Sequence, residues 1–436
     1  MAKVISIGNQ SFESIREKDN FYIDKTNFIR EWWDNDDTVT LITRPRRFGK
    51  TLNMSMLECF FSNKYKDRGD LFEGLEIWND EKYRTKLVTQ LFGDRMMIAN
   101  ATGCSSIWGA SAPAMPYTKN YKGHGPAWAN SLFEDNAEYG LGMYLGVKAV
   151  RDRLAENMTA AAAGNVSADL KAALEDWVAN KENGEGSRER AEKLTALLEA
   201  EKAGNADLEH LYANKQFFVK RSQWIFGGDG WAYDIGYGGL DHVLASGDDV
   251  NIMVFDTEVY SNTGGQSSKS TPEAAVAKFA ASGKRTKKKD LGMMAMSYGY
   301  VYVAQINMGY DKNQALKAIK EAEAYHGPSL IICYSPCINH GIKRGMQHSF
   351  QEAKAAVDSG YWVNFRYNPE LKEEGKKSFF LDSKAPTEDF ETFLKGEVRY
   401  ASLAKTFPDI AESLFAKTKK DAEERLENYK KLDAAE

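Results

Sequence analysis

The sequence has 436 residues, of which 43% are hydrophobic and 27% charged, so the chain is long enough for a large core and for two or three domains. Its formal net charge of −5 argues against nucleic-acid-binding and membrane-surface proteins, which carry a basic excess. No signal peptide and no membrane-spanning apolar run is recognisable, so the cytoplasm is the expected compartment. The four cysteines are too few for a disulfide framework and indicate buried thiols or metal ligands.

The first 84 residues differ in character from the rest. An apolar strand predicted over residues 38–43 leads into Arg44-Pro-Arg-Arg-Phe-Gly-Lys-Thr, and a helix is expected after it. A strand, a loop ending in Gly-Lys-Thr and a helix are the context of a P-loop, in which Lys50 would reach phosphates and Thr51 would hold Mg²⁺. The pattern departs from this motif because Arg44 stands in place of the first Gly and no strand ending in a Walker B acid comes after it.

This variant of the motif, together with the Asp-Lys-Thr stretch that begins at Asp24, resembles the AAA-ATPase-like family. The resemblance implies ATP binding at Lys50 and Thr51, and a remnant module without hydrolysis is the alternative. It ends near residue 84 without a Gly-, Ser- or Pro-rich linker. Residues 1–84 are therefore expected to form a small truncated P-loop-like α/β fragment, fused abruptly to the rest of the chain through a rearranged or misassembled reading frame.

The next part of the chain predicts a strand, a long loop and a helical insertion. A short buried strand is expected at 96–99. Cys104 lies in the loop after it, and because free cysteines are commonly buried, its residue type alone predicts a small buried side chain. Residues 109–142 are rich in Gly, Pro and aromatic residues, as in loops that wall a site. His124 could serve there as a base, but its flanking glycines favour a turn residue. Alanine-rich amphipathic stretches predict a helical insertion over about 145–220.

Two apolar strands, 223–226 and 251–255, each lead into a polar glycine-bearing loop, with a helix expected between them at 238–245. This is a βαβ unit with its chemistry at the carboxyl ends of parallel strands. Ser270-Thr-Pro-Glu is expected to begin a helix. The basic run at 284–289 is either a solvated loop or a docking patch for an acidic partner. Further elements are expected as strands at 301–306, 329–334 and 361–367 and helices at 313–325 and 408–432.

The two loops after these strands carry groups suited to a cation and an anion. The first places the carboxylate of Asp229 between two glycines, so that the backbone can approach an anion while the carboxylate faces a cation. The second offers the hydroxyl of Thr257, the carbonyl of Val259 and the amide of Asn262. Together they predict a diphosphate held by Mg²⁺, and an ordinary turn is the alternative for the glycine–aspartate cluster alone.

The residues around these loops are Gly-Asp-Gly-Trp-Ala-Tyr-Asp-Ile-Gly-Tyr-Gly-Gly-Leu-Asp-His and Asp-Thr-Glu-Val-Tyr-Ser-Asn-Thr-Gly-Gly-Gln-Ser-Ser-Lys. They resemble the thiamine-diphosphate domain of the pyruvate:ferredoxin (flavodoxin) oxidoreductases, and the likeness runs from about residue 85 to residue 436, over the last third or so of that family's usual chain. It implies an α/β, parallel-sheet thiamine-diphosphate-binding fold over 85–436 that contains the helical insertion. It implies Mg²⁺ bound by Asp229, Thr257 and the Val259 carbonyl. The implied cofactor contacts are Cys104, Gly228, Asp229, Gly230, Trp231, Thr257, Val259 and Asn262.

The resemblance also implies a catalytic residue and an iron–sulfur centre. Asn262 would face the substrate, and Cys104 and Cys337 would be two ligands of the [4Fe–4S] cluster nearest the thiamine. Such a cluster needs four ligands, and the family's other two come from a Cys-x-x-Cys-Gly whose place here, 78–84, holds no cysteine. A complete cluster is therefore not expected in this chain. Cys333 lies within a predicted strand and is expected to pack in the core.

The implied reaction is the oxidative decarboxylation of pyruvate to acetyl-CoA with electron transfer to iron–sulfur clusters. The implied partners are pyruvate, coenzyme A and ferredoxin or flavodoxin, with a homodimer or a complementing subunit. Several catalytic parts of the family precede the point where the resemblance begins, so activity of this chain alone is not expected. A nucleotide-binding AAA-ATPase-like module and a non-catalytic fusion product are the alternatives.

Overall fold

The computed structural model describes residues 11–18, 20, 22, 55, 56, 58, 59, 71, 88–103, 105, 106, 117–120 and 122–435. Near the N-terminus these include one short helix, α1 (Phe12–Glu17), whose N-cap Ser11 accepts a backbone hydrogen bond. The expected P-loop with Lys50 and Thr51 lies outside the described residues, and so does Cys104.

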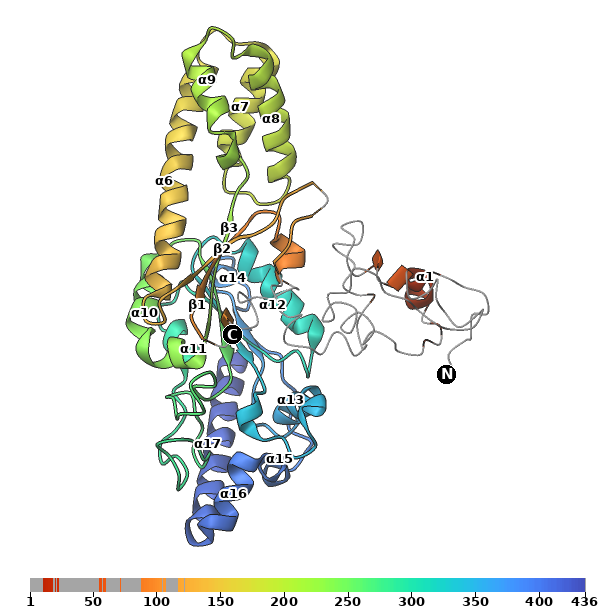
Figure 1. The fold of residues 1–436 in the computed structure, drawn as a ribbon, viewed down its shortest axis with the longest axis vertical. Coiled ribbons are helices and arrows are strands. Elements are labelled where there is room, and N and C mark those ends of the chain that lie inside the picture. Colours follow the sequence, from red (N-terminus) through yellow and green to blue (C-terminus); the bar gives the residue numbers. More distant parts are fainter. Residues whose placement is uncertain are drawn as a thin grey trace.

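Eight strands of the described chain form one sheet in the order β2-β1-β3-β4-β6-β5-β7-β8 (Figure 1). The first six strands in this order pair in parallel, and β7 and β8 add antiparallel pairs at one edge. Their bounds are β1 (Met96–Ala101), β2 (Ala127–Ser131), β3 (Ser222–Gly228), β4 (Asn251–Asp256), β5 (Tyr302–Ile306), β6 (Ser329–Tyr334), β7 (Phe365–Tyr367) and β8 (Phe379–Leu381).

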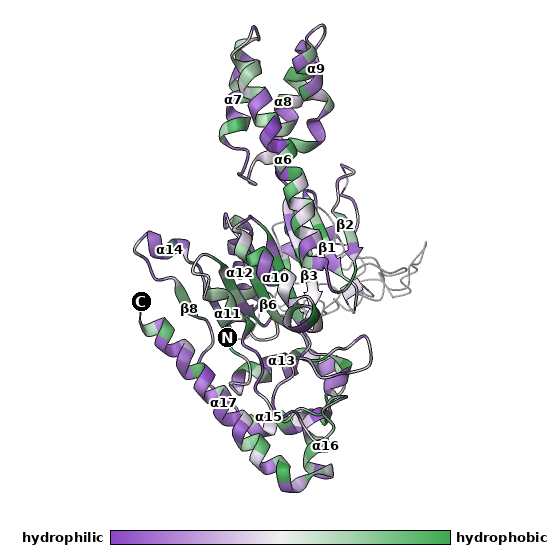
Figure 2. Ribbon diagram, turned by 90° about the vertical axis from the view of Figure 1, so that its left-hand side faces the viewer, coloured by the Kyte–Doolittle hydropathy of each residue, from purple (hydrophilic) through white to green (hydrophobic). Residues whose placement is uncertain are grey.

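The central strands are buried on both faces, which explains their nearly continuous apolar sequences (Figure 2). One face of the sheet packs against α6 (Asn136–Ala162), α10 (Tyr237–Ser246) and α11 (Leu291–Met296), and the other against α12 (Lys312–Ala324). Cys333 is 2% exposed and belongs to the second of these cores, which confirms the expectation of core packing.

The helical insertion projects from one end of the sheet (Figure 1). It consists of the outer part of α6 with α7 (Ala168–Ala179), α8 (Ser187–Glu201) and α9 (Ala206–Ala213), followed by the 3-10 turn η4 (Lys215–Phe217). These helices have their own apolar core, separate from the two cores of the sheet. The amphipathic pattern therefore correctly predicts the insertion.

Most of the carboxyl-terminal helices pack below the sheet (Figure 1). They are α13 (Ser349–Asp358), α14 (Glu370–Glu373), α15 (Phe390–Gly396), α16 (Val398–Thr406) and α17 (Pro408–Ala434). Three short elements come before them in the chain: the π-helix η5 (Gly230–Ile235) and the 3-10 turns η6 (Ile338–His340) and η7 (Met346–His348). Leu414 and Leu426 of α17 are buried, as the apolar stripe predicts. No helix of the described chain is long and apolar enough to cross a membrane.

Three element predictions are wrong. Strand β2 lies within the stretch predicted as loop, because its Ala-Trp-Ala-Asn-Ser sequence is partly exposed at the sheet edge and lacks β-branched residues. The expected strand at 361–367 shortens to β7, and β8 pairs with it. No helix begins at Ser270, because Ser268 and Thr271 use their hydroxyls to bind the neighbouring loops and Ala274 has a φ of 68°.

Candidate functional site

The two predicted loops leave the sheet side by side. Asp229 directly follows β3, and Thr257 directly follows β4. The parallel register places Gly228 opposite Phe255, so both loops begin at the same level of the same edge. Gly230 opens the π-helix η5, a rare conformation that occurs frequently at functional sites.

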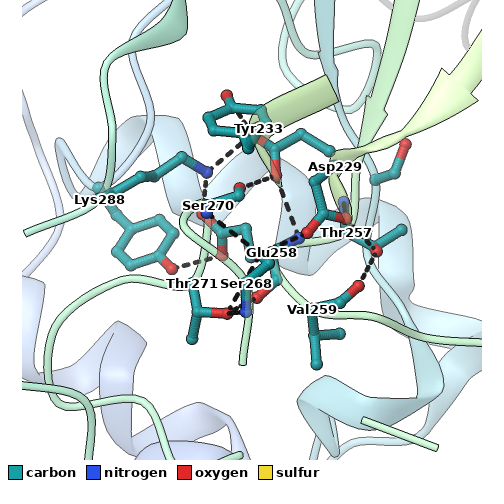
Figure 3. Close-up of polar contacts among 12 residues, drawn as sticks. Asp229, Tyr233, Thr257, Glu258, Val259, Ser268, Ser270, Thr271 and Lys288 are labelled. Carbon is teal, nitrogen blue, oxygen red and sulfur yellow. Dashed lines mark hydrogen bonds and ion pairs between the residues drawn. The ribbon is translucent and has the colours of Figure 1, made fainter. Parts of the chain in front are cut away.

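Four oxygen-bearing groups of these loops converge (Figure 3). The hydroxyl oxygen of Thr257 lies 2.8 Å from Asp229 Oδ1, 2.9 Å from the carbonyl oxygen of Val259 and 2.8 Å from the hydroxyl oxygen of Ser261. The backbone N–H of Thr257 also donates to Asp229 Oδ1 at 3.2 Å, and Ser268 Oγ donates to Asp229 Oδ2 at 2.7 Å. The structure thus brings together the three residues that the sequence predicts as Mg²⁺ ligands.

The carboxylate of Asp229 is buried, and among the described residues its side-chain hydrogen-bond donors are hydroxyl groups. Asp229 is only 1% exposed. Burial, and to a smaller extent the negative charge of Asp256, raises the pKa of Asp229 to about 7. The hydrogen bonds from Ser268 and Thr257 lower this pKa, but by less. A bound cation would stabilise the ionised carboxylate and remove this cost.

These groups fit a small divalent cation. Oxygen ligands of octahedral Mg²⁺ lie at about 2.0–2.1 Å from the ion, so neighbouring ligands are about 2.9 Å apart. The spacings from Thr257 to Asp229 and to Val259, 2.8 and 2.9 Å, agree with this value. One carboxylate leaves room for ligand phosphates, which Mg²⁺ commonly retains in protein sites. We conclude that the three residues could hold Mg²⁺ together with a diphosphate.

Glycines let the first loop pack closely against its aromatic residue, Trp231. This side chain is fully buried, and a Cβ on Gly227 would lie 2.3 Å from its ring. A Cβ on Gly230 would lie 2.5 Å from the ring of Tyr260, in the second loop. The backbone of both loops can therefore approach each other, or a ligand, only because these positions lack side chains.

The Gly227→Ala substitution is expected to destabilise the chain by about 1–3 kcal/mol, because the new methyl group would displace a buried indole. The free energy of unfolding in denaturant would show this loss, with a shifted tryptophan emission. Gly142→Ala is the matched control, since nothing lies within 4 Å of its Cβ in helix α6. That control is expected to gain about 0.5–1 kcal/mol from the helix propensity of alanine; equal effects of the two changes would contradict the packing argument.

A buried ionic network supports the second loop from behind. Lys288 Nζ donates to Asp256 at 2.8 Å and to Glu258 at 2.9 Å, and the guanidinium of Arg399 donates to Glu258 at 2.8 Å. Burial alone would raise the pKa of Glu258, but Lys288 and Arg399 outweigh it and lower the pKa to about 2. Tyr361 Oη also donates to Glu258, at 2.6 Å. The negative charge of Glu258 is therefore compensated within the fold.

This network corrects part of the reading of the basic run at 284–289, in which Arg285 and Lys287 are exposed, as a solvated loop predicts. Lys288 points inward toward Glu258 (Figure 3) and donates to both Asp256 and Glu258, so its charge is neither solvated nor free for docking. Lys284 also turns inward and donates to the carbonyls of Ser268 and Thr271. The acidic residues that flank Thr257, at 256 and 258, are the signal in the sequence that could have indicated these inward lysines.

The other predicted site residues lie around this centre. Asn262 is exposed in the turn after Ser261 and makes none of the contacts that join the Mg²⁺-ligand candidates. Cys337, after β6, is partly exposed, and its thiol lies 3.2 Å from Ser261 Oγ. His124 is partly buried near Arg188, far along the chain from these loops, and its pKa is lowered by burial and by that guanidinium. The described residues contain no cluster of three or more His, Cys, Asp or Glu side chains suited to a metal.

Family models match three parts of the chain. Residues 6–91 match the family described as predicted AAA-ATPase. Residues 150–205 match the insertion domain of pyruvate-ferredoxin oxidoreductase. Residues 213–333 match the C-terminal TPP binding domain of thiamine pyrophosphate enzymes, and this match contains Asp229, Thr257 and Val259.

Known proteins agree with these models. The chain is 66% identical over 351 residues to the pyruvate-flavodoxin oxidoreductase of Klebsiella pneumoniae, and 62% identical over 352 residues to the pyruvate:ferredoxin oxidoreductase of Moorella thermoacetica. Each comparison covers 80% of this chain and 30% of the relative, so the chain spans less than a third of the length of these proteins. A solved 2-oxoglutarate:ferredoxin oxidoreductase from Magnetococcus marinus is 14% identical, covers 76% of this chain and 83% of its own, and has a TM-score of 0.36, a similarity too weak for comparing sites.

Helices α7 and α8 of the insertion and the loops that hold the converging oxygens lie within these matches. The part of the chain that carries the site is therefore similar to the pyruvate:ferredoxin (flavodoxin) oxidoreductases, through matches to their insertion domain and to a thiamine pyrophosphate binding domain, and it is preceded by a segment similar to the AAA-ATPase-like family.

Proposed function

We propose that this chain binds thiamine diphosphate through Mg²⁺ at the edge of the sheet where β3 and β4 end. The observation that carries the proposal is the convergence of Asp229, Thr257 and Val259 oxygens at spacings suited to one small divalent ion. The match of residues 213–333 to a TPP binding domain supports the identity of the diphosphate.

In this proposal the chain's own residues bind and orient the cofactor. Asp229, ionised, and the oxygens of Thr257 and Val259 hold Mg²⁺, while the glycines beside Asp229 let the backbone approach the diphosphate. The buried Trp231 excludes water from beneath this loop. Bound thiamine diphosphate supplies the nucleophilic carbon for attack on the keto group of a 2-oxoacid, a reactivity that belongs to the cofactor.

The reaction we propose for this site is the family's oxidation of pyruvate to acetyl-CoA, with Asn262 placing the substrate. Its exposed position in the turn after Ser261 supports that role. Coenzyme A and ferredoxin or flavodoxin are the proposed partners, by similarity to relatives named for pyruvate and these electron carriers. The chain spans 30% of those relatives, and in this proposal a complementing subunit supplies the parts of the reaction that lie outside the match. A homodimer is the alternative assembly.

Cys104 and Cys337 are proposed as ligands of an iron–sulfur cluster, with the rest of the ligand set supplied from outside this chain. The position of Cys337 beside Ser261, next to the Mg²⁺-ligand loop, supports a cluster close to the thiamine. Iron and sulfide analysis of the protein purified without oxygen tests this point. Iron and acid-labile sulfide in a 1:1 ratio, lost in Cys337→Ser, are the expected result for the assembled enzyme.

Calorimetric titration of the full chain with thiamine diphosphate tests the main proposal. Binding at one site per chain is expected with millimolar Mg²⁺, and no binding is expected with a chelator in place of Mg²⁺, because the diphosphate contacts the loops through the ion. The buried Trp231 at the base of the site provides a second signal, quenching of its fluorescence. Binding that is absent, or unaffected by the chelator, would overturn the proposal.

Nucleotide binding at Lys50 and Thr51 is a separate hypothesis, suggested by the match of residues 6–91. Titration of the full chain with ATP and Mg²⁺, compared with its Lys50→Ala variant, tests it independently of the thiamine site. Equal heats for the two proteins would reject nucleotide binding by this motif.

A further inference from the structure

His340 makes a direct contact with the backbone of the Mg²⁺-ligand loop. Its Nε2 lies 2.8 Å from the carbonyl oxygen of Thr257. A carbonyl oxygen can only accept, so Nε2 must carry the hydrogen of this bond. His340 is inaccessible to solvent, at 0% exposure, so the imidazole N–H has no water as an alternative partner.

The histidine is itself held in place from behind. Its Nδ1 faces Glu397 Oε1 at 3.4 Å without a hydrogen bond between them, and Glu397 accepts from Arg399 Nε at 2.6 Å. The chain after His340 pairs with the chain around Glu397, because Val398 N–H donates to the Gly341 carbonyl at 2.9 Å and Lys343 N–H donates to the Gly396 carbonyl at 3.0 Å. The imidazole therefore occupies a fixed position relative to Thr257.

The loop that His340 contacts adopts a strained conformation. Glu258, between the two ligands Thr257 and Val259, has a φ of 58°, in the left-handed region that side chains other than glycine rarely adopt. Such a residue persists only where its surroundings determine it. Lys288 and Arg399 hold the side chain of Glu258, and His340 holds the carbonyl that precedes it. The loop is thus fixed from both sides of the strained residue.

We propose that His340 is a positioning residue for the Mg²⁺–thiamine diphosphate site: it holds the Thr257 carbonyl so that the hydroxyl of Thr257 and the carbonyl of Val259 face Asp229. The identity of the ligand in this inference, thiamine diphosphate, rests on the proposed function. The ordering of the Thr257 loop by His340 rests on the geometry alone. His340 also joins the loop of Cys337 to the loop of Thr257, since Cys337 and His340 lie three residues apart in the same turn.

Two substitutions separate positioning from general packing. His340→Gln keeps an N–H donor that can reach the Thr257 carbonyl, whereas His340→Phe keeps a ring and removes the donor. Both replace the buried imidazole and are expected to lower the unfolding temperature, His340→Phe by the larger amount because it also leaves the Thr257 carbonyl without its donor. With saturating Mg²⁺, the Kd for thiamine diphosphate is expected to rise about tenfold or more in His340→Phe, the range for lost supporting contacts at metal sites, and much less in His340→Gln.

Hydrogen exchange of the ligand-free full chain supplies a readout that needs no cofactor. Peptides that cover residues 257–265 are expected to exchange several-fold faster in His340→Phe than in His340→Gln, with no difference in peptides from helix α7. Equal exchange in the two variants, or equal affinities for thiamine diphosphate, would overturn the assignment. If the unmodified chain bound no thiamine diphosphate, the proposed function would fail, while the exchange result would still decide whether His340 orders the loop.

Discussion

Asp229→Asn is expected to abolish Mg²⁺-dependent binding of thiamine diphosphate, with a Kd raised by about 100-fold or more, because it removes the only carboxylate among the proposed ligands. Asparagine preserves the shape of the side chain. Its carbonyl oxygen can still accept from Thr257, and its amide group can donate to the hydroxyl oxygen of Ser268 in place of the bond that Ser268 now donates. Calorimetric titration with thiamine diphosphate at saturating Mg²⁺ measures the change.

The same substitution is expected to stabilise the ligand-free chain at pH 8. Burial raises the pKa of Asp229 to about 7 from an ordinary value of 3.8, so the folded chain opposes ionisation of this carboxyl group. Between about pH 4 and pH 7 the unfolded chain therefore binds fewer protons than the folded chain. The stability contributed by protonated Asp229 is lost as the pH rises through this range. Asparagine mimics the protonated form, so its unfolding temperature is expected to exceed that of the unmodified chain at pH 8 and to equal it near pH 4.

Asp311→Asn provides the matched control for both measurements. Asp311 caps helix α12 by accepting from the N–H of Gln314, and asparagine caps helices about as well. This control is expected to change neither the affinity nor the pH dependence of unfolding. Retained binding in Asp229→Asn, or a loss of stability at pH 8 with no loss at pH 4, would contradict the assignment of Asp229 as a ligand kept ionised by a cation.

Arg399→Met is expected to destabilise the chain by about 3–5 kcal/mol, the cost of breaking a buried ion pair by removing one partner. The guanidinium donates to Glu397 at 2.6 Å and to Glu258 at 2.8 Å, and both carboxylates are almost fully buried. Methionine fills a similar volume but leaves two carboxylates with less positive charge beside them. Chemical denaturation at pH 7 measures the loss.

The expected loss also depends on pH. Arg399 helps to lower the pKa of Glu258 and of Glu397 against the effect of burial, so the stability that these carboxylates contribute is present above about pH 4.5 and declines as the pH falls toward their folded values. Arg399→Met is therefore expected to reduce the difference in stability between pH 7 and pH 3. Arg153→Met, an exposed position on helix α6, is the control and is expected to change stability by less than about 0.5 kcal/mol. Similar losses in the two variants would contradict the network.

The local pattern of the sequence predicts the elements that carry the site. Strands β3 and β4 are continuous apolar segments followed by glycine-bearing loops, and the parallel βαβ arrangement requires their carboxyl ends to meet. From these two facts the proximity of Asp229 and Thr257 follows without any other part of the chain. The insertion helices are equally accessible to prediction, because their amphipathic period is a local property.

The support behind the site could not be predicted in this way. Arg399 is 141 residues from Glu258 along the chain, and His340 is 83 residues from Thr257. Nothing in the local pattern around these residues distinguishes a buried partner from a solvated charge, and for this reason the local pattern places the lysines at 284–289 on the surface. The absence of a helix after Ser270 has the same origin, since the hydroxyls of Ser268 and Thr271 bind groups that only the folded loops bring near.

The amino-acid sequence by itself determined the α/β class, the order of the loops after the central strands and the ligand candidates at their ends, because hydrophobic period and glycine placement act over a few residues. Only the tertiary structure decided which charges are buried, which histidine holds the strained loop and how the edge strands pair. Those outcomes depend on desolvation and on contacts between distant segments, and both exist only after the chain has folded.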